Sequence, residues 1–233
     1  MTVSVVERQM NQVEQSLEMP AAGVTLAADL AVPARAAGLV LFAHGSGSSR
    51  HSSRNRYVAR ELQNAGLATA LADLLTPDEE RADAQSGQYR FDIDKLSVRV
   101  IALTDWLLGH DATAGLGVGL FGASTGAAAA LVAAAARPFT VEAVVSRGGR
   151  PDLAGEFLRL VFQPTMLIVG GYDATVIELN RNATQVLPVE TRLEIVPGAT
   201  HLFEEPGALE QAARLARDWF LRHLKPLHAA RAH

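Results

Sequence analysis

Short apolar runs alternate along the chain with longer amphipathic stretches. Most of the apolar runs lack the polar–apolar alternation of a strand that has one solvated face. This pattern predicts an α/β fold in which mostly parallel strands, buried on both faces, are joined by crossover helices. Strands are expected at residues 38–43, 67–74, 117–121, 143–146, 166–169 and 192–196, and helices at 54–65, 93–108, 125–136, 175–186 and 207–224.

We expect the whole chain, residues 1–233, to form a single domain around a core at about 38–224. Near the N-terminus, residues 13–32 contain two apolar runs on either side of a Pro-Ala-Ala-Gly turn, which predicts an antiparallel hairpin at the sheet edge. Residues 75–90 are polar and predict a long loop, either plainly solvated or functional. The tail at 226–233 is expected to fray.

Composition narrows the class of protein. With 233 residues, 48% of them hydrophobic, the chain is long enough for one sizeable core, and its net charge of −4 argues against a nucleic-acid partner. The absence of cysteine excludes disulfides and thiolate metal sites. The N-terminal residues lack the basic start and apolar stretch of a secretory signal, so a cytoplasmic location is expected. Residues 112–136 are uncharged, but their glycines and alanines indicate a strand, a turn and a helix rather than a membrane span.

One motif carries chemistry of its own. Gly122-Ala123-Ser124-Thr125-Gly126 matches G-x-S-x-G, with an apolar strand expected directly before it and an alanine-rich helix directly after it. In this context the serine occupies a sharp, strained turn, and the flanking glycines avoid collisions with neighbouring backbone. Ser124 is therefore the candidate nucleophile.

A serine hydroxyl requires a base, and the base requires an orienting group. Asp173 follows the strand expected at 166–169, and His201 follows the strand expected at 192–196. Both positions lie at carboxyl ends of strands, where ligands bind in open α/β sheets. We predict His201 as the general base and Asp173 as its orienting acid, with Asp152 as the reserve acid.

An acyl-transfer intermediate also needs donors for its oxyanion. The N–H of Thr125, the residue after the nucleophile, is one predicted donor. The second is expected from the glycine-rich loop after the strand at 38–43, where we choose the N–H of Ser46, with Gly45 and Gly47 as alternatives. His44 is expected to brace this loop.

Four arginines lie near predicted strand ends. Arg50 and Arg54 follow the glycine-rich loop, and Arg147 and Arg150 follow the strand at 143–146. Arginine holds carboxylates and phosphates by bidentate contacts, so Arg50, Arg54 and Arg147 are candidates to bind an anionic substrate group. Solvated surface arginine is the alternative interpretation.

The sequence gives little support for a dinucleotide-binding motif or for a metal site. Residues 117–122 also spell G-x-G-x-x-G, but these glycines lie inside the apolar run instead of after it, unlike a dinucleotide fingerprint. The seven histidines show no metal-ligand spacing. We therefore expect no cofactor and no metal.

The segments LVLFAHGSGSS, GLFGASTGAAAA, MLIVGGYD and VPGATHLFEEPG resemble the α/β-hydrolase superfamily, most closely its dienelactone-hydrolase-like branch. The resemblance covers about residues 24–224, but the namesake enzymes carry a cysteine nucleophile where this chain has Ser124. It implies a serine esterase that cleaves small esters through an acyl-enzyme. The connection from Arg147 to Gln163 is too short for a large cap domain, and no membrane partner is expected. Acyl transfer to another acceptor and non-catalytic binding of a small molecule remain alternatives, and either a monomer or a homodimer is compatible.

Overall fold

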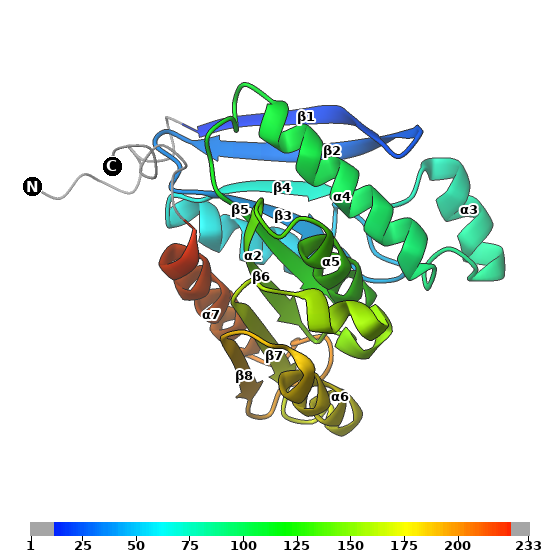
Figure 1. The fold of residues 1–233 in the computed structure, drawn as a ribbon, viewed down its shortest axis with the longest axis vertical. Coiled ribbons are helices and arrows are strands. Elements are labelled where there is room, and N and C mark those ends of the chain that lie inside the picture. Colours follow the sequence, from blue (N-terminus) through cyan, green and yellow to red (C-terminus); the bar gives the residue numbers. More distant parts are fainter. Residues whose placement is uncertain (1–11, 225–233) are drawn as a thin grey trace, which may run out of the picture.

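The computed structural model describes residues 12–224, whose strands form one eight-stranded sheet with helices on both faces (Figure 1). The strands are β1 (Gln12–Ala21), β2 (Val24–Pro33), β3 (Leu39–Ala43), β4 (Ala68–Ala72), β5 (Val118–Ala123), β6 (Val141–Arg147), β7 (Thr165–Gly170) and β8 (Thr191–Val196). Their order in the sheet is β1-β2-β4-β3-β5-β6-β7-β8. β2 pairs antiparallel with β1 and with β4, and the pairings from β4 onward to β8 are parallel. The predicted α/β fold and its edge hairpin are confirmed.

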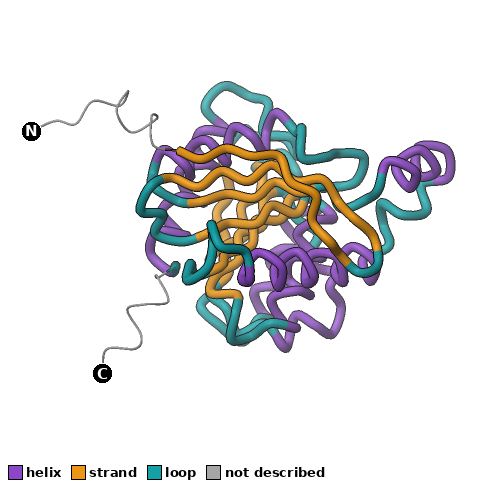
Figure 2. Tube along the Cα trace, turned by 90° about the horizontal axis from the view of Figure 1, so that it is seen from above, coloured by secondary structure: helices purple, strands orange, loops and turns teal. Residues whose placement is uncertain are grey.

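Helices cover the two faces of this sheet unequally. They are α2 (Ser53–Asn64), α3 (Pro77–Ser86), α4 (Ile93–Gly109), α5 (Thr125–Ala136), the 3-10 helix η1 (Pro151–Leu160), α6 (Ala174–Val186) and α7 (Ala208–His223). α2 and α7 pack together on one face, while α4, α5, η1 and α6 cover the other. Figure 2 shows the strands enclosed between these helical layers.

The two layers bury opposite sides of the same strands. In β3, Leu39 and Leu41 join the core under α4 and α5, whereas Val40 and Phe42 join the core under α2 and α7. Successive side chains of a strand point to opposite faces, so a strand covered on both sides must be apolar throughout. This explains the continuous apolar runs in the sequence.

Residues 75–90 depart from the sequence-based prediction. They contain a helix, α3, instead of forming a loop. The Thr76 side chain accepts a hydrogen bond from the Glu79 N–H, the Glu79 carboxylate accepts one from the Thr76 N–H, and Pro77 occupies the first turn. This capping box and N-terminal proline specify a helix start even when the helix has no apolar face. The signal was present in the sequence as Thr-Pro-Asp-Glu, and the prediction of a loop was wrong.

The uncharged residues 112–136 contain β5, a tight turn and α5. None of the helices described between residues 12 and 224 is both long and apolar enough to cross a membrane. The expected fraying of residues 226–233 concerns a segment outside the described residues.

The sheet topology brings four loops to one edge. Because the strands from β3 to β8 run parallel, the segments that follow β3, β5, β7 and β8 all emerge at the carboxyl edge of the sheet. These segments carry residues 44–49, Ser124, Asp173 and His201. The fold thus places the chemically suggestive side chains together.

Candidate active site

Ser124 occupies a strained turn between β5 and α5. Its backbone angles are φ 51° and ψ −122°, a region that a residue with a side chain rarely adopts. The Ser124 N–H donates to the Arg147 carbonyl at 3.2 Å, and the Ser124 carbonyl accepts from the Arg150 N–H at 3.1 Å. Strand β6 and the loop that follows it therefore hold the strained residue in place.

The two glycines of the motif allow the backbone to pack without side chains. A Cβ on Gly122 would lie 2.3 Å from the Cα of Ala127, and a Cβ on Gly126 would lie 2.2 Å from the carbonyl oxygen of Ala43. Both distances are much shorter than a van der Waals contact. The atoms concerned belong to the backbone, which cannot move aside as a flexible side chain can. The glycines are thus a steric requirement of the turn.

His201 links Ser124 to Asp173. The His201 Nε2 lies 3.3 Å from the Ser124 Oγ, and its Nδ1 lies 2.6 Å from the Asp173 Oδ2. With the Nδ1 proton donated to the carboxylate, Nε2 is left as the acceptor for the serine hydroxyl. The structure therefore brings together the three side chains predicted as nucleophile, base and acid.

The two candidate acids differ in what their carboxylates contact. Asp173 occupies the N-cap position of α6, but its side chain makes no capping hydrogen bond and faces His201 instead. Asp152 lies in η1, where both of its oxygens accept from the Arg150 guanidinium, at 2.8 and 2.7 Å. Only Asp173 is placed to orient the histidine.

The glycine-rich loop at residues 44–49 borders Ser124. Gly45 packs so closely that a Cβ there would lie 2.9 Å from the Ser124 Cβ. The Ser46 N–H donates to the Thr125 Oγ1 at 2.9 Å, so this predicted oxyanion donor already has a partner. The same hydrogen bond ties the loop to the first residue of α5, which carries the other predicted donor.

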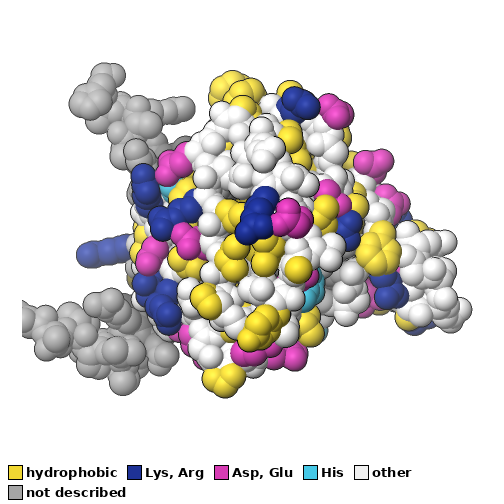
Figure 3. Space-filling view, turned by 90° about the horizontal axis from the view of Figure 1, so that it is seen from below, with side chains coloured by type: hydrophobic (Ala, Val, Ile, Leu, Met, Phe, Trp, Pro, Cys, Tyr) yellow, Lys and Arg dark blue, Asp and Glu magenta, His cyan; other side chains and the backbone are white. Residues whose placement is uncertain are grey.

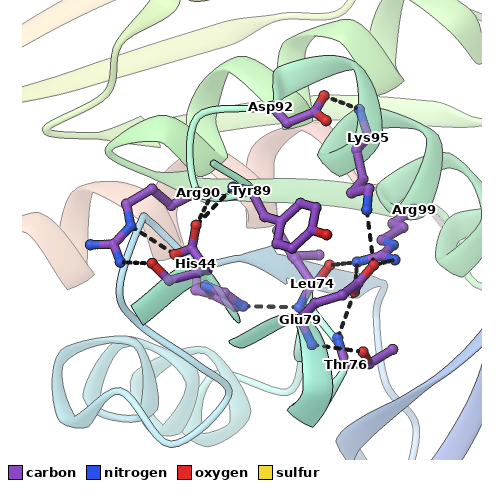
Figure 4. A network of polar contacts seen from close by, with 10 residues as sticks. His44, Leu74, Thr76, Glu79, Tyr89, Arg90, Asp92, Lys95 and Arg99 are labelled. Carbon is purple, nitrogen blue, oxygen red and sulfur yellow. Dashed lines mark hydrogen bonds and ion pairs between the residues drawn. The ribbon is translucent and has the colours of Figure 1, made fainter. Parts of the chain in front are cut away.

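His44 links the glycine-rich loop at residues 44–49 to the segment that follows β4. Its Nε2 accepts a hydrogen bond from the Leu74 N–H at 3.0 Å (Figure 4). Its Nδ1 lies 2.9 Å from the Gly45 carbonyl oxygen. Burial lowers the pKa of His44, which favours the neutral ring that this arrangement requires. The structure gives His44 both the partners and the burial of a bracing residue.

A cavity of about 250 Å³ opens beside Ser124. The residues that line it include Ser48, Ser52, Arg54, Asn55, Ser124, Arg147, His201 and Leu202. A second cavity, of about 300 Å³, lies on the other side of the loop and is bordered by α3 and α4. Residues 45, 46 and 48 border both cavities, so the loop separates them.

The three predicted substrate-binding arginines have different surroundings. Arg54 lines the cavity beside Ser124 and forms an ion pair with Glu204 at 3.1 Å. Arg50 does not line it, because its guanidinium is paired with Asp73 and lies 3.7 Å from the Asp29 carboxylate. Arg50 is therefore not placed to hold a substrate group in this cavity.

Arg147 lines the same cavity and is 7% exposed. Its Nη2 donates to the Asn55 Oδ1 at 3.2 Å, and its guanidinium carbon lies 5.8 Å from the centre of the Phe203 ring. Burial, together with the charge of Arg54, lowers the pKa of Arg147 to about 10, so the group is still charged at neutral pH. Asn55 was missed by the sequence analysis, since its contact with a residue on β6 depends on tertiary packing alone.

No group of metal-binding side chains was found among residues 12–224. On the face shown in Figure 3, basic side chains are mixed with acidic ones instead of forming one continuous patch.

A mostly parallel sheet with a serine on a strained strand-to-helix turn defines an α/β-hydrolase. No family model matches the chain. The chain is 55% identical to a dienelactone hydrolase from Anabaena variabilis, whose crystal structure it matches with a TM-score of 0.91 over 92% of this chain and 100% of that one. The chain belongs to the dienelactone hydrolase-like family.

Two further comparisons define the limits of this relationship. Est1E from Butyrivibrio proteoclasticus shares the fold, with a TM-score of 0.73 and 17% identity over 89% of this chain and 98% of that one. Two curated relatives from Mycobacterium tuberculosis strains are 58% identical over 91% of this chain, and each is named a putative phosphoribosyl transferase. The chain spans only 47% of the length of these relatives.

Proposed function

We propose that the chain is a serine hydrolase that cleaves small carboxylic esters through an acyl-enzyme. The observation that carries this proposal is the hydrogen-bonded series from Ser124 through His201 to Asp173 on the carboxyl edge of the sheet. Such a series converts a weak hydroxyl nucleophile into a reactive one. Relatives with solved structures include a dienelactone hydrolase and several esterases, which supports ester hydrolysis.

Each residue has a defined role in the proposed reaction. His201 Nε2 accepts the hydroxyl proton as Ser124 Oγ attacks the ester carbonyl, and it returns that proton to the departing alcohol. Asp173 holds the imidazole in the productive orientation and stabilises its positive charge. A water molecule, activated by the same histidine, then hydrolyses the acyl-enzyme.

The oxyanion requires donors on the side of the glycine-rich loop. The Thr125 N–H is one, and we retain the Ser46 N–H as the second, with Gly45 and Gly47 as neighbouring alternatives. Because the Ser46 N–H bonds to Thr125 Oγ1, the oxyanion must share or replace this partner. The hydroxyl of Thr125 therefore influences how well the loop stabilises the intermediate.

The size of the cavity favours small substrates. Its volume of about 250 Å³ is below the range of about 300–1,000 Å³ that is usual for drug-sized ligands. Between β6 and β7, a common place for a cap, there is only the short helix η1. The name phosphoribosyl transferase belongs to proteins about twice as long, so the proposal rests on the site and not on that name.

Replacement of the nucleophile tests the proposal. Ser124→Ala should lower kcat for 4-nitrophenyl acetate by about 10⁴-fold or more and abolish labelling by a serine-directed phosphonate, with little change in Tm. Ser97→Ala is a matched control, because this buried serine on α4 does not line the cavity. Wild-type protein that resists the phosphonate would instead be a binding protein, and transfer of the acyl group to an added alcohol would indicate an acyltransferase.

A further inference from the structure

Arg147 is a buried charge with no acidic partner among the described residues. Its guanidinium donates from Nη2 to the neutral side chain of Asn55, and within residues 12–224 its Nε and Nη1 atoms have no hydrogen-bond partner. An unpaired charge and unsatisfied buried donors are costly to a folded protein. Phe203 offsets only part of this cost, because its ring lies 5.8 Å from the guanidinium carbon. Arg147 lines the cavity beside Ser124, so an anion bound there would lie next to this unpaired charge.

The first turn of α2 borders the same cavity. Ser52, the N-cap, and Arg54 and Asn55, in the first turn, all line it. The first turn carries no acidic residue, so nothing on the helix itself neutralises its positive end. The Asn55 N–H is capped by the Ser52 Oγ at 3.3 Å, and the positive end of the helix dipole still makes the helix start a favourable site for an oxyanion. This observation is independent of Arg147 and indicates the same ligand charge.

The charges around the cavity favour a doubly charged group. The positive charge of Arg54 is balanced by Glu204. The uncompensated positive charge is therefore that of Arg147 plus about half a charge at the N-terminus of α2. A carboxylate carries one negative charge, whereas a phosphate monoester carries about 1.5 to 2 at neutral pH. Phosphate therefore matches the uncompensated charge more closely. Ser48 and Ser52 add hydroxyl donors to the lining.

We propose that this cavity binds an oxyanion group of the substrate, a phosphate monoester in preference to a carboxylate, and that Arg147 and the first turn of α2 hold it. The proposal rests on the proposed ester hydrolysis, since it specifies the substrate of the same site. Because Ser124 and His201 line the same small cavity, the anionic group and the ester lie only a few bonds apart. The phosphate is a binding group and is not itself cleaved, so the enzyme acts on short carboxylic esters that also carry a phosphate.

Inhibition by simple anions tests the site while the ester reaction is running. We expect inorganic phosphate to inhibit the hydrolysis of 4-nitrophenyl butyrate competitively and more tightly than acetate does at the same ionic strength. Arg147→Met should weaken inhibition by phosphate about tenfold or more. Arg150→Met is the matched control, because Arg150 follows the same strand but pairs with Asp152 and does not line the cavity. It should leave the inhibition constant for phosphate unchanged.

Thermal stability tests the same site without catalysis. In the Ser124→Ala background, phosphate should raise Tm relative to chloride at equal ionic strength, and this increase should be lost with Arg147→Met but largely kept with Arg147→Lys. Without phosphate, Arg147→Met should have a Tm equal to or above that of the parent, because it removes an unpaired buried charge. A merely structural arginine would behave in the opposite way.

The outcomes separate this proposal from the proposed function. Ester hydrolysis that phosphate does not inhibit, together with no phosphate-dependent change in Tm, would overturn the anion site and leave the hydrolase intact. Equal or tighter binding of acetate would overturn the preference for phosphate. An increase in Tm that depends on Arg147, in a wild-type protein without esterase activity, would support the anion site and overturn the ester hydrolase.

Discussion

Arg99 and Arg147 are two buried arginines that lie in opposite kinds of surroundings. Arg99, on α4, donates to both Glu79 oxygens at 2.6 and 2.7 Å and to the Leu74 carbonyl at 2.6 Å (Figure 4). Arg147 has a single neutral partner and borders an open cavity. Burial is nearly the same in the two cases, so burial alone does not mark function. The proposed anion site rests instead on the missing acidic partner of Arg147, because a buried arginine that serves stability alone is expected to have such a partner.

The same distinction holds for the two regions as a whole. The corner between α3 and α4 is stabilised by a satisfied network, in which Glu79 also accepts from Lys95 and from the Thr76 N–H. At Ser124 the backbone is strained, and two guanidinium nitrogens of Arg147 have no hydrogen-bond partner among residues 12–224. One region should therefore respond to mutation through stability, and the other through activity.

The largest expected effect is on kcat, and it should distinguish the carboxylate of Asp173 from that of Asp152. Asp173→Asn should lower kcat for 4-nitrophenyl acetate by about 10³–10⁴-fold, because asparagine favours the wrong tautomer of His201. Asp152→Asn is the matched control, since its carboxylate is already used by Arg150, and it should keep kcat within about threefold. If Asp152→Asn were the more damaging change, the orienting acid would be misassigned.

Arg99→Met should disrupt the hydrogen-bond network between α3 and α4 without changing kcat. Removal of one member of a buried ion pair leaves Glu79 and the Leu74 carbonyl short of donors, so the free energy of unfolding should fall by about 3 kcal/mol in urea denaturation. Arg137→Met provides the comparison, because its pair with Asp105 is partly exposed and should contribute about 0.5–1 kcal/mol. An Arg99→Met protein as stable as wild type would refute the structural role of this network.

Glu79 should make the free energy of unfolding depend on pH, through its hydrogen-bond network between α3 and α4. The Arg99 guanidinium, with help from Lys95 and the Thr76 N–H, lowers the pKa of Glu79 to about 2. A lowered folded-state pKa stabilises the protein above the unfolded-state value, and this stabilisation is lost as pH falls from about 4.5 to about 2. Glu79→Gln should therefore cost about 2 kcal/mol at pH 7, and the difference from wild type should shrink through that window.

The measurement for Glu79→Gln is a series of urea denaturations from pH 7 down to pH 2. Asp78→Asn, on the exposed side of the same helix, should change the free energy of unfolding by at most about 0.5 kcal/mol at any pH. A difference between Glu79→Gln and wild type that persisted unchanged at low pH would show that the carboxylate charge is not its source.

The smallest expected effect lies in the loop beside Ser124. Thr125→Val removes the acceptor of the Ser46 N–H but keeps the Thr125 N–H, so it should lower kcat about tenfold by loosening the loop, with little change in Tm. Thr125→Ser keeps the hydroxyl and should stay near wild type. A rise in kcat for Thr125→Val would mean that the hydroxyl competes with the oxyanion for Ser46.

The fold could be read from the sequence because its strands are buried on both sides. Continuous apolar runs have few other interpretations, and each predicted strand has a counterpart between β1 and β8. α3 was missed because a search for apolar periodicity does not detect a helix whose only buried side chain is Asp83. Its start was encoded in capping chemistry at Thr76 instead.

The site was predictable where backbone geometry dictates residue type. The G-x-S-x-G turn and the loops after β7 and β8 are short-range features, and the structure places all three side chains within reach of one another. The sequence did not show which of the candidate arginines has an acidic partner. Arg50 and Arg147 lie in similar sequence contexts at the ends of predicted strands. Only the tertiary structure shows that Arg50 lies beside Asp29 and Asp73, whereas Arg147 has no acidic partner among the described residues.

The close packing around Gly122 and Gly126 has a consequence for engineering this protein. A side chain at either position would collide with backbone, so the frame that carries Ser124 offers no freedom for variation. The cavity wall is different, because Ser48, Ser52, Arg54 and Arg147 line an open volume instead of packing only against backbone. Libraries that seek new substrates should therefore randomise these four positions and leave the turn untouched, and natural divergence in specificity is expected along the same wall.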